Sequence, residues 1–370
     1  MIDGANMYDY LIVGSGLCGA VIARELTNAG KKCIVFEKRE KIGGNLRCEK
    51  IEGIDVHLYG AHIFRTNDDE VWEYVNKYTK FNNFINSPLA NYKGKIYNLP
   101  FNMNTFNKMW GVVFPNEAKK KIEESRIKCD EPKNLEEYIL DKVGSDIYET
   151  LIKGYTEKQW GRSCKELDKS VMRRIPLRFT YDNNYYNAKY QGIPIDGYNA
   201  FIEKLLDGID VVKSINIKND EALKKIANKI IYTGPIDEFY DNCYGVLEYR
   251  SLKFEHIVLD EENHQGNAVV NYTDRDVPYT RIIEHKHFTG VESPKTVITK
   301  EYPAKWTEGL EKYYPIENKE NMDLYEKYKE RAKQDGIVLA GRLAEYKYYD
   351  MSDTIKSALN VAKRELEVMK

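Results

Sequence analysis

A glycine-rich turn, Gly14 to Gly19, connects a short run of aromatic and β-branched residues, Tyr8 to Val13, to a helical pattern from Leu17 to Ala29. The turn has the form GxGxxG: the first glycine makes the bend, the second lets backbone N–H groups approach a pyrophosphate, and the third allows the helix to pack closely on the strand. The next apolar run, Cys33 to Phe36, is followed by Glu37, whose carboxylate can accept hydrogen bonds from ribose hydroxyls. The segment predicts a βαβ unit that binds a dinucleotide with an unphosphorylated adenosine ribose. The alternative is a glycine-rich packing turn.

A second pair of glycines, Gly43-Gly44, comes six residues after Glu37. This arrangement resembles FAD-binding folds of the glutathione-reductase and amine-oxidase type and is not expected of a plain NAD site. Near the C-terminus the Gly341-Arg342 turn fits the same fold, because a helix that starts at about Asp353 would direct its positive N-terminus at the pyrimidine end of a flavin. The sequence therefore predicts FAD as the cofactor.

The middle of the chain differs from both ends in composition and in hydrophobic pattern. It becomes charged and helical: Asn134 can cap a helix that runs to Gly144, and a second helix is predicted from Asp146 to Lys153, ending at Gly154. From Leu252 to Tyr302 the hydrophobic period approaches two, which indicates an antiparallel sheet.

The last forty residues return to the opening pattern, with a buried-strand candidate at Ile337 to Ala340 and a terminal helix whose apolar face includes Ile355 and Leu366. A chain that starts and ends in one architecture predicts an α/β fold, in which a discontinuous Rossmann-like FAD-binding domain carries an inserted helical domain and an antiparallel β-sheet substrate domain. We expect the FAD-binding domain at residues 7–84, 193–250 and 317–370, the helical domain with a mobile loop at 98–175, and the sheet domain at 85–97, 176–192 and 251–316.

Charge and composition argue against several partners. Lys and Arg number 56 and Asp and Glu number 58, a net charge of −2, which gives no general attraction to nucleic acid or to an anionic membrane. The longest apolar stretch, Tyr10 to Ala23, is interrupted by glycines and is too short to span a membrane. The six cysteines form no CxxC pair, which argues against a zinc site or a disulfide framework. We expect a cytoplasmic protein that binds no nucleic acid, no metal and no membrane.

Eight segments along the chain carry a family resemblance. They are GAHIF (60–64), NSPLA (86–90), LPFNMNTF (99–106), KGYTEKQWGR (153–162), RRIPLRF (173–179), YQGIP (190–194), YTRIIEHKHF (279–288) and GRLAEYKYYDM (341–351). Together they closely resemble bacterial UDP-galactopyranose mutases, and the resemblance extends from Met7 to the C-terminal helix.

The resemblance implies an isomerase that interconverts UDP-galactopyranose and UDP-galactofuranose without net redox change but with the flavin reduced. Ring contraction requires the bond between C1 and the ring oxygen to break while C1 stays held, and N5 of reduced FAD can hold C1 as a covalent sugar adduct while UDP leaves. The resemblance also suggests NADH or NADPH as the external reductant, a homodimer, and a role in cell-surface polysaccharide biosynthesis.

The resemblance also assigns roles to residues at matching positions. Arg174 and Arg281 match two arginines that neutralise the diphosphate, the first on a mobile loop at 163–176, and a planar guanidinium can donate to two phosphate oxygens. Tyr155 and Trp160 match aromatic residues that receive the uridine and the adjoining sugar, since uracil can stack on a ring. The other predicted substrate contacts are Asn86, Tyr185, Tyr314 and Tyr348, with Tyr313 and Tyr349 as adjacent alternatives.

His62 matches a histidine beside the flavin ring, where a neutral imidazole can accept or donate a hydrogen bond near N5. Without the resemblance, a single histidine in an apolar strand is an ordinary hydrogen-bonded core residue. The other residues expected around FAD come from the glycine turns, the segments that follow them and the C-terminal turn: Gly14, Ser15, Gly16, Gly19, Glu37, Lys38, Gly43, Gly44, Asn45, Gly60, Ala61, Gly341, Arg342, Asp350 and Met351.

One position departs from the family pattern. Where the family commonly reads GAHIFHT, this chain has Arg65 before Thr66. A guanidinium can donate to an acetamide carbonyl, so we hypothesise that Arg65 accommodates a 2-acetamido group and that UDP-N-acetylgalactosamine is a substrate alongside, or in preference to, UDP-galactose. The alternative is that Arg65 points away from the sugar and the specificity is ordinary.

Two other functions are compatible with the nucleotide-binding start. A flavin amine-oxidase-like oxidoreductase would have a largely apolar substrate cavity, whereas the predicted arginines and tyrosines favour an anionic nucleotide. A catalytically silent flavoprotein that binds sugar nucleotides would lack essential residues, whereas the matching set in this chain has no gap.

Overall fold

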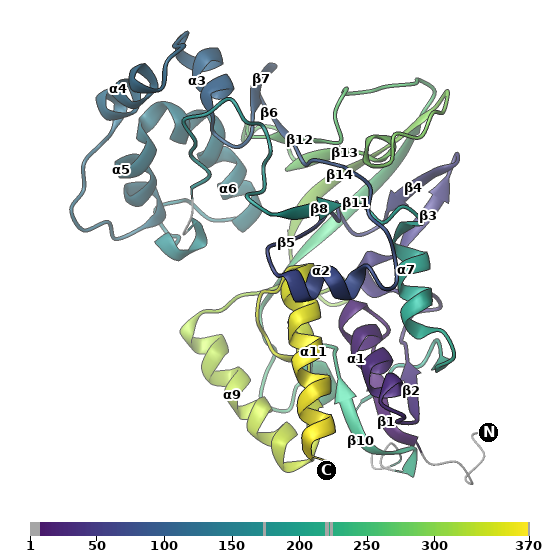
Figure 1. Ribbon diagram of the computed structural model, residues 1–370. Helices are drawn as coiled ribbons and strands as arrows, with labels where there is room; N and C mark the ends of the chain where they lie inside the picture. Colours follow the sequence, from purple (N-terminus) through teal and green to yellow (C-terminus); the bar gives the residue numbers. More distant parts are fainter. Residues whose placement is uncertain (1–7, 173–174, 219–221, 223–224, 369–370) are drawn as a thin grey trace.

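A parallel sheet of five strands, in the order β16-β10-β1-β2-β9, forms one half of the molecule (Figure 1). The structure is a computed structural model that describes residues 8–172, 175–218, 222 and 225–368. Every neighbouring pair in this sheet is parallel. The strands are β1 (Tyr8–Val13), β2 (Cys33–Phe36), β9 (Asp210–Val212), β10 (Ala227–Tyr232) and β16 (Ile337–Leu339).

Successive residues of β1 pack on opposite faces of this sheet. Tyr10 and Ile12 join a core with α1, α2, α7 and α11, whereas Leu11 and Val13 join a second core with α8 and α9. A parallel sheet buried on both faces is the doubly wound arrangement that the glycine-rich turn predicts. The helices are α1 (Leu17–Asn28), α2 (Asp69–Val75), α7 (Gly197–Leu206), α8 (Ile236–Phe239), α9 (Lys319–Gln334) and α11 (Met351–Val368).

A second sheet has seven strands in the order β15-β11-β14-β13-β12-β6-β7. The predicted antiparallel pairing is confirmed, with one exception: β12 runs parallel to β6, which comes from the chain before the helical insertion. A hydrophobic period of two does not specify which distant strand becomes the neighbour. The strands are β6 (Leu89–Tyr92), β7 (Lys95–Asn98), β11 (Tyr249–Leu259), β12 (Val269–Tyr272), β13 (Arg281–Glu284), β14 (Thr296–Lys305) and β15 (Tyr314–Pro315).

Two small antiparallel pairs and several short helical turns complete the two halves. β3 (Cys48–Ile51) pairs with β4 (Ile54–His57), and β5 (Phe64–Thr66) pairs with β8 (Tyr190–Gly192). The short turns are η1 (Gly44–Leu46), η5 (His285–Phe288) and α10 (Gly341–Ala344).

The helical insertion has its own core, built from α3 (Met103–Trp110), α4 (Pro115–Ser125), α5 (Leu135–Ile147), η2 (Tyr148–Ile152), α6 (Lys153–Trp160) and η3 (Lys169–Met172). The predicted cap is confirmed, because the Asn134 side chain accepts a hydrogen bond from the Glu137 backbone N–H at 2.9 Å. Gly144 interrupts the helical path with a φ of 81°, in the left-handed region that glycine tolerates.

The predicted helix end at Gly154 is wrong. The chain continues through η2 into α6 and ends its helical course at Trp160, where Gly161 has a left-handed φ of 66°. Gly154 lies inside α6 because the helix packs there directly on backbone, and a Cβ at this position would collide with the carbonyl oxygen of Thr273. The glycine thus marks a close approach between two elements and not a stop.

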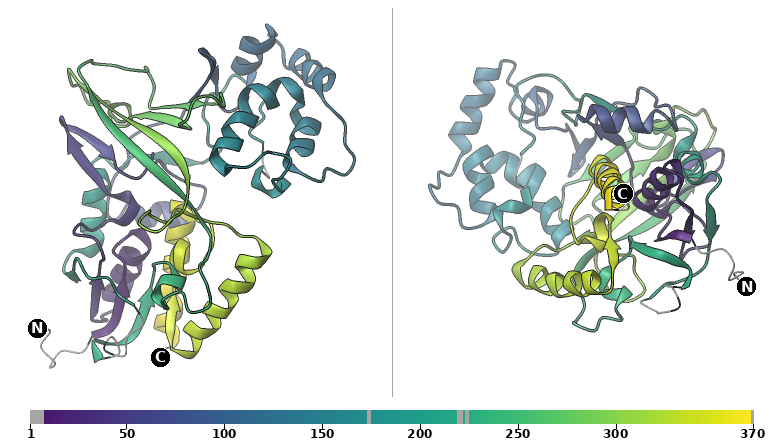
Figure 2. Two further views of the ribbon diagram at one scale, coloured as in Figure 1. Left: turned by 180° about the vertical axis from the view of Figure 1, so that it is seen from behind. Right: turned by 60° about the horizontal axis from the view of Figure 1, so that its bottom comes forward.

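Two views show how the halves sit relative to each other. The helical insertion, coloured blue to teal, lies at one corner of the molecule, with α11 and β1 at the opposite end and the long strands β11 and β14 between them (Figures 1 and 2). None of the described helices is both long and apolar enough to cross a membrane. The residue limits of the three domains stay a prediction.

Candidate active site

A cleft of about 2020 Å³ lies where four strands of the parallel sheet end and the seven-stranded sheet begins. Its walls include the turns after β1, β2, β10 and β16, the 59–65 loop, the end of α6, and residues of β11, β13 and β14. Sites for single small ligands commonly have about 300–1,000 Å³, so the cleft has room for two ligands side by side. Ligands of doubly wound folds bind at this edge, outside the carboxyl ends of the strands.

The two glycine turns pack against each other at one end of the cleft. Gly14 has a φ of 108° and its Cα lies against Thr233, and a Cβ at Gly19 would collide with the carbonyl oxygen of Gly14. Gly44, from the second pair, approaches so closely that a Cβ there would lie 2.9 Å from the Cα of Gly16. Two bare backbone turns at the N-terminus of α1 form a cradle that fits a pyrophosphate.

Glu37 is fixed at the end of β2. One of its carboxylate oxygens accepts hydrogen bonds from the backbone N–H and the hydroxyl of Ser15 at 2.9 and 2.6 Å, and the other accepts from the Arg39 backbone N–H at 2.9 Å. Ser15 is completely buried, so its side chain orients Glu37. Lys38 and Arg39 pair with Glu311, at 3.3 and 3.0 Å, on the loop that follows β14. The Glu37 carboxylate is therefore held in place by the protein itself.

His62 brings a neutral imidazole to the cleft. Burial lowers its pKa to about 4, and within the described residues its Nε2 atom is buried without a hydrogen-bond partner. A buried polar atom without a partner costs free energy, which a bound ligand with a donor or acceptor at this point would recover. The glycine cradle, Glu37 and this nitrogen together fit FAD.

A network of histidines that the sequence reasoning missed lies behind His62. The His62 backbone N–H donates to Nδ1 of His57 at 3.1 Å, and the His57 backbone N–H donates to Nδ1 of His285 at 3.2 Å. His285 Nε2 then meets the Thr299 hydroxyl at 2.6 Å, which also meets Nδ1 of His256 at 2.7 Å. Four of the chain's six histidines lie in this network. In the sequence, the short spacing between His57 and His62 is the one feature that could have indicated it.

Arg281 stands at the start of β13 and joins the sheet to the helical insertion. Its Nη2 donates to the hydroxyl of Tyr155 on α6 at 2.5 Å, and its Nε lies 3.3 Å from Glu301 on β14. Burial alone would lower the pKa of Arg281, but the neighbouring Glu301 and Tyr155 raise it. The guanidinium thus stays charged in the cleft wall, with its fork oriented by both partners.

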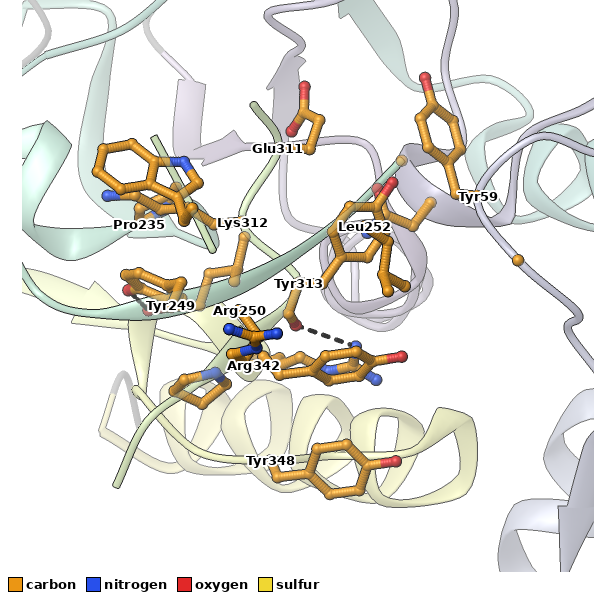
Figure 3. Close-up of a pocket in the computed structure, with 18 of the residues that line it drawn as sticks. Tyr59, Pro235, Tyr249, Arg250, Leu252, Glu311, Lys312, Tyr313, Arg342 and Tyr348 are labelled. Carbon is orange, nitrogen blue, oxygen red and sulfur yellow. Dashed lines mark hydrogen bonds between the residues drawn. The ribbon is translucent and has the colours of Figure 1, made fainter. Parts of the chain in front are cut away.

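Arg342 lies beside a pair of tyrosine rings, with its guanidinium carbon 5.4 Å from the Tyr314 centroid and 5.3 Å from the Tyr348 centroid, and the two centroids are 5.8 Å apart. It donates to the carbonyl oxygens of Tyr313, at 3.3 Å, and Tyr349. Figure 3 shows the bond to Tyr313, with Tyr348 on the other side of the arginine. Tyr313, Tyr314 and Tyr348 line the cleft, so the alternative between Tyr313 and Tyr314 stays open.

Arg65 points into the cleft wall and not away from it. Its Nη2 lies 3.3 Å from Asp350, and its guanidinium carbon lies 4.2 Å from the centroid of the Tyr186 ring. Asp350 in turn accepts from the backbone N–H of Asp353 at 2.9 Å in the first turn of α11. The ion pair and the ring together fix the direction of the guanidinium.

Most of the predicted site residues line this one cleft: Gly14, Gly16, Glu37, Lys38, Gly43, Gly44, Asn45, Gly60, Ala61, His62, Arg65, Trp160, Arg281, Tyr314, Gly341, Arg342, Tyr348, Asp350 and Met351. Ser15, Gly19 and Tyr155 lie behind the wall, where they hold Glu37, α1 and Arg281. Tyr185 packs on the core of the insertion while Tyr186 lines the cleft, and Asn86 is bonded through its backbone to Gln191 and Tyr185. Arg174 lies outside the described residues.

Comparison with known proteins agrees with this geometry. A family model described as UDP-galactopyranose mutase matches residues 150–348, and a model described as an NAD(P)-binding Rossmann-like domain matches residues 12–78. The chain belongs to the UDP-galactopyranose mutase family. It is accordingly a sugar-nucleotide mutase, an isomerase, with the fold of a flavoprotein.

Relatives match over nearly the whole length. The dTDP-fucopyranose mutase of Escherichia coli is 40% identical over 96% of this chain and 98% of its own, and a probable UDP-galactopyranose mutase of Klebsiella pneumoniae is 40% identical over 96% and 94%. A crystal structure of reduced UDP-galactopyranose mutase matches with a TM-score of 0.74 over 98% of this chain and 94% of its own, at 16% identity. (S)-6-Hydroxynicotine oxidase of Paenarthrobacter nicotinovorans matches 20% of this chain, so its sequence likeness to this chain is limited to a short part.

Proposed function

We propose that this protein interconverts UDP-galactopyranose and UDP-galactofuranose with FAD in its reduced form. The observation that carries the proposal is a single cleft with a dinucleotide cradle at one end and a wall of arginine and tyrosine at the other. An anionic nucleotide would be attracted by the arginines of such a wall, whereas a protonated amine substrate would be repelled by them. Membership of the mutase family supports the same reaction.

The dinucleotide would lie across the two glycine turns. Backbone N–H groups at the N-terminus of α1 bind its pyrophosphate, and Glu37 accepts from the adenosine ribose. The N-terminus of α11, which begins at Met351, and Arg342 face the flavin end. Reduced flavin supplies a nucleophilic nitrogen for C1 of the sugar.

His62 is the residue that can control a proton at that nitrogen. Because burial lowers its pKa to about 4, the imidazole is neutral at pH 7, with one ring nitrogen that donates and one that accepts. Its backbone N–H is already occupied by His57, so only the ring is available to a ligand. A neutral ring leaves the electron pair of the flavin nitrogen free, whereas an imidazolium would compete for it.

Arg281 would stabilise the departing diphosphate, with Arg174 from the 163–176 loop as a predicted second donor. The Arg281 fork is held by Tyr155 and Glu301, so little rotamer entropy is lost when phosphate binds. Trp160 on α6 would receive the uridine, with Tyr155 behind the wall holding Arg281, and the tyrosines around Arg342 would approach the phosphates.

Arg65 is our candidate for the choice of sugar. Its position on the cleft wall supports the hypothesis that it donates to a 2-acetamido carbonyl and admits UDP-N-acetylgalactosamine. A second candidate substrate is dTDP-fucose, because a relative of that name is 40% identical to this chain. The reductant NADH or NADPH, the homodimer, the cytoplasmic location and the link to polysaccharide biosynthesis stay predictions.

The test is turnover of UDP-galactose, UDP-N-acetylgalactosamine and dTDP-fucose by the purified protein, with and without dithionite, with furanose products separated by chromatography. We expect product from UDP-galactose only after reduction. Arg65→His should lower the relative rate on the N-acetyl sugar and spare UDP-galactose. Equal turnover by the oxidised protein would refute the reaction, and an unchanged sugar preference in Arg65→His would refute the role of Arg65.

A further inference from the structure

A half-buried lysine joins the helix that carries the predicted uridine contacts to the sheet that carries Arg281. The Lys158 ammonium on α6 donates to three backbone carbonyl oxygens, those of Tyr272 at 2.7 Å, Val277 at 2.9 Å and Tyr279 at 3.0 Å. All three acceptors belong to the end of β12 and the connection from β12 to β13. Arg281 follows two residues after the last of them.

Lys158 lines the cleft, and a lysine in the wall of a nucleotide site suggests a phosphate ligand. An ammonium group has three N–H donors, and here each has a carbonyl acceptor within 3.0 Å. Phosphate binding would have to break one of these bonds. The geometry therefore favours a tie between two backbone segments over a direct contact with substrate.

The same face of α6 makes three further contacts with this connection. Gly154 lies against the backbone of Thr273 and Arg275, where a side chain would not fit. Glu157 pairs with Arg275 at 3.2 Å, and Tyr155 accepts from Arg281 at 2.5 Å. Side chains one, three and four positions after Gly154 thus dock the helix on this loop and on β13, which follows it.

We propose that Lys158 is a positioning residue for nucleotide binding: it sets the distance between Tyr155 and Trp160 on α6 and Arg281 on β13. This inference rests on the proposed function, because it assumes that base and diphosphate are bound by these two elements. The two elements come from chain segments more than a hundred residues apart, so no local sequence rule holds them in register. A central ammonium that bonds three carbonyls at once can do so, because its loss would leave three partly buried acceptors without this donor.

The experiment compares Lys158→Met with Lys153→Met in the FAD-loaded enzyme. Methionine keeps a long apolar stem but removes the three donors. Lys153 is the matched control because it lies on the same helix and its ammonium pairs with Glu149 on the preceding turn, at 2.9 Å, instead of with the β12–β13 connection. UDP affinity is measured by calorimetry, kcat and KM with the reduced enzyme, and flavin content from the absorption spectrum.

We expect Lys158→Met to weaken UDP binding and raise KM by about tenfold or more, with kcat within about threefold and flavin content unchanged, since a displaced helix costs binding before chemistry. Lys153→Met should match the wild type. If the wild type binds UDP and Lys158→Met binds it equally well, this inference is overturned and the proposed function stands. If Lys158→Met loses flavin while Lys153→Met keeps it, the inference is also overturned, because the lysine would then support the fold in general. A wild type without affinity for UDP would overturn the proposed function as well.

Discussion

Acid should unfold this protein through its buried histidines before its carboxylates are protonated. His57 and His285 are 2% and 1% exposed, and each Nδ1 accepts a backbone N–H, so neither ring can take a second proton without breaking a bond. Burial lowers the pKa of His285 to about 3 and that of His57 well below its ordinary value of 6.5. Below pH 6.5 the unfolded chain binds these protons and the folded protein does not, so the free energy of unfolding falls as the pH falls.

At pH 5 each such histidine lowers the free energy of unfolding by about 2 kcal/mol relative to pH 7.5, and the pair by about 4 kcal/mol. Carboxylates act later: burial alone would raise the pKa of Glu284, but hydrogen bonds from His287 and from the backbone of His264 and Gln265 lower it to about 2, so its contribution is lost mainly below the ordinary pKa of 4.5. The assay is urea unfolding at both pH values.

The decisive variant is His285→Asn, whose side-chain oxygen can replace Nδ1 as an acceptor but does not titrate. Between pH 7.5 and pH 5 it should lose about 2 kcal/mol less than the wild type. The matched control is His264→Asn, on the loop between β11 and β12 and outside the network, which should keep the full loss. A wild-type loss below about 1 kcal/mol, or the full loss in His285→Asn, would refute the reasoning.

Two further predictions concern the cleft. Gly19→Ala should lower the FAD content of the purified protein, because the new Cβ would collide with the carbonyl oxygen of Gly14 and open the turn; flavin absorbance at the wild-type level would contradict this. Arg342→Gln should weaken UDP binding and flatten its salt dependence more than Arg65→Gln, because Arg65 already pairs with Asp350; calorimetry at two salt concentrations measures both effects, and equal losses would count against the difference.

The sequence predicts the nucleotide half of this protein well because its signals are local. The order strand, glycine turn, helix and strand fixes a βαβ unit within thirty residues, and the buried faces of β1 follow directly from its apolar run. Gly43-Gly44 predicts the second turn, although not that it would meet Gly16 at van der Waals distance. The cap at Asn134 is equally local, since donor and acceptor are three residues apart.

The parts that sequence reasoning missed depend on distant contacts. From the sequence, Gly154 is expected to end a helix. The contact that requires a glycine there is with the backbone of Thr273, which lies more than a hundred residues away in the sequence. The hydrogen bond from the Ser15 hydroxyl to Glu37 joins two residues 22 positions apart, so no local pattern reveals it. The partners of Lys158 are carbonyl oxygens, which no side-chain pattern reveals.

The net positive charge around the cleft is smaller than the number of its arginines would suggest. Three arginines of the cleft each pair with a carboxylate: Arg281 with Glu301, Arg65 with Asp350 and Arg39 with Glu311. Each pair orients a guanidinium but adds little net charge to the cleft. Arg342 and Arg250, which also lines the cleft, are different, because their side-chain hydrogen bonds go to backbone carbonyl oxygens and neither pairs with a carboxylate of the described residues. A diphosphate that gains negative charge as it leaves the sugar is stabilised by an unpaired cation, whereas an arginine paired with a carboxylate mainly contributes N–H donors in a fixed orientation. The acidic partners therefore fix geometry, and the attraction for an anionic substrate depends on the arginines that lack one.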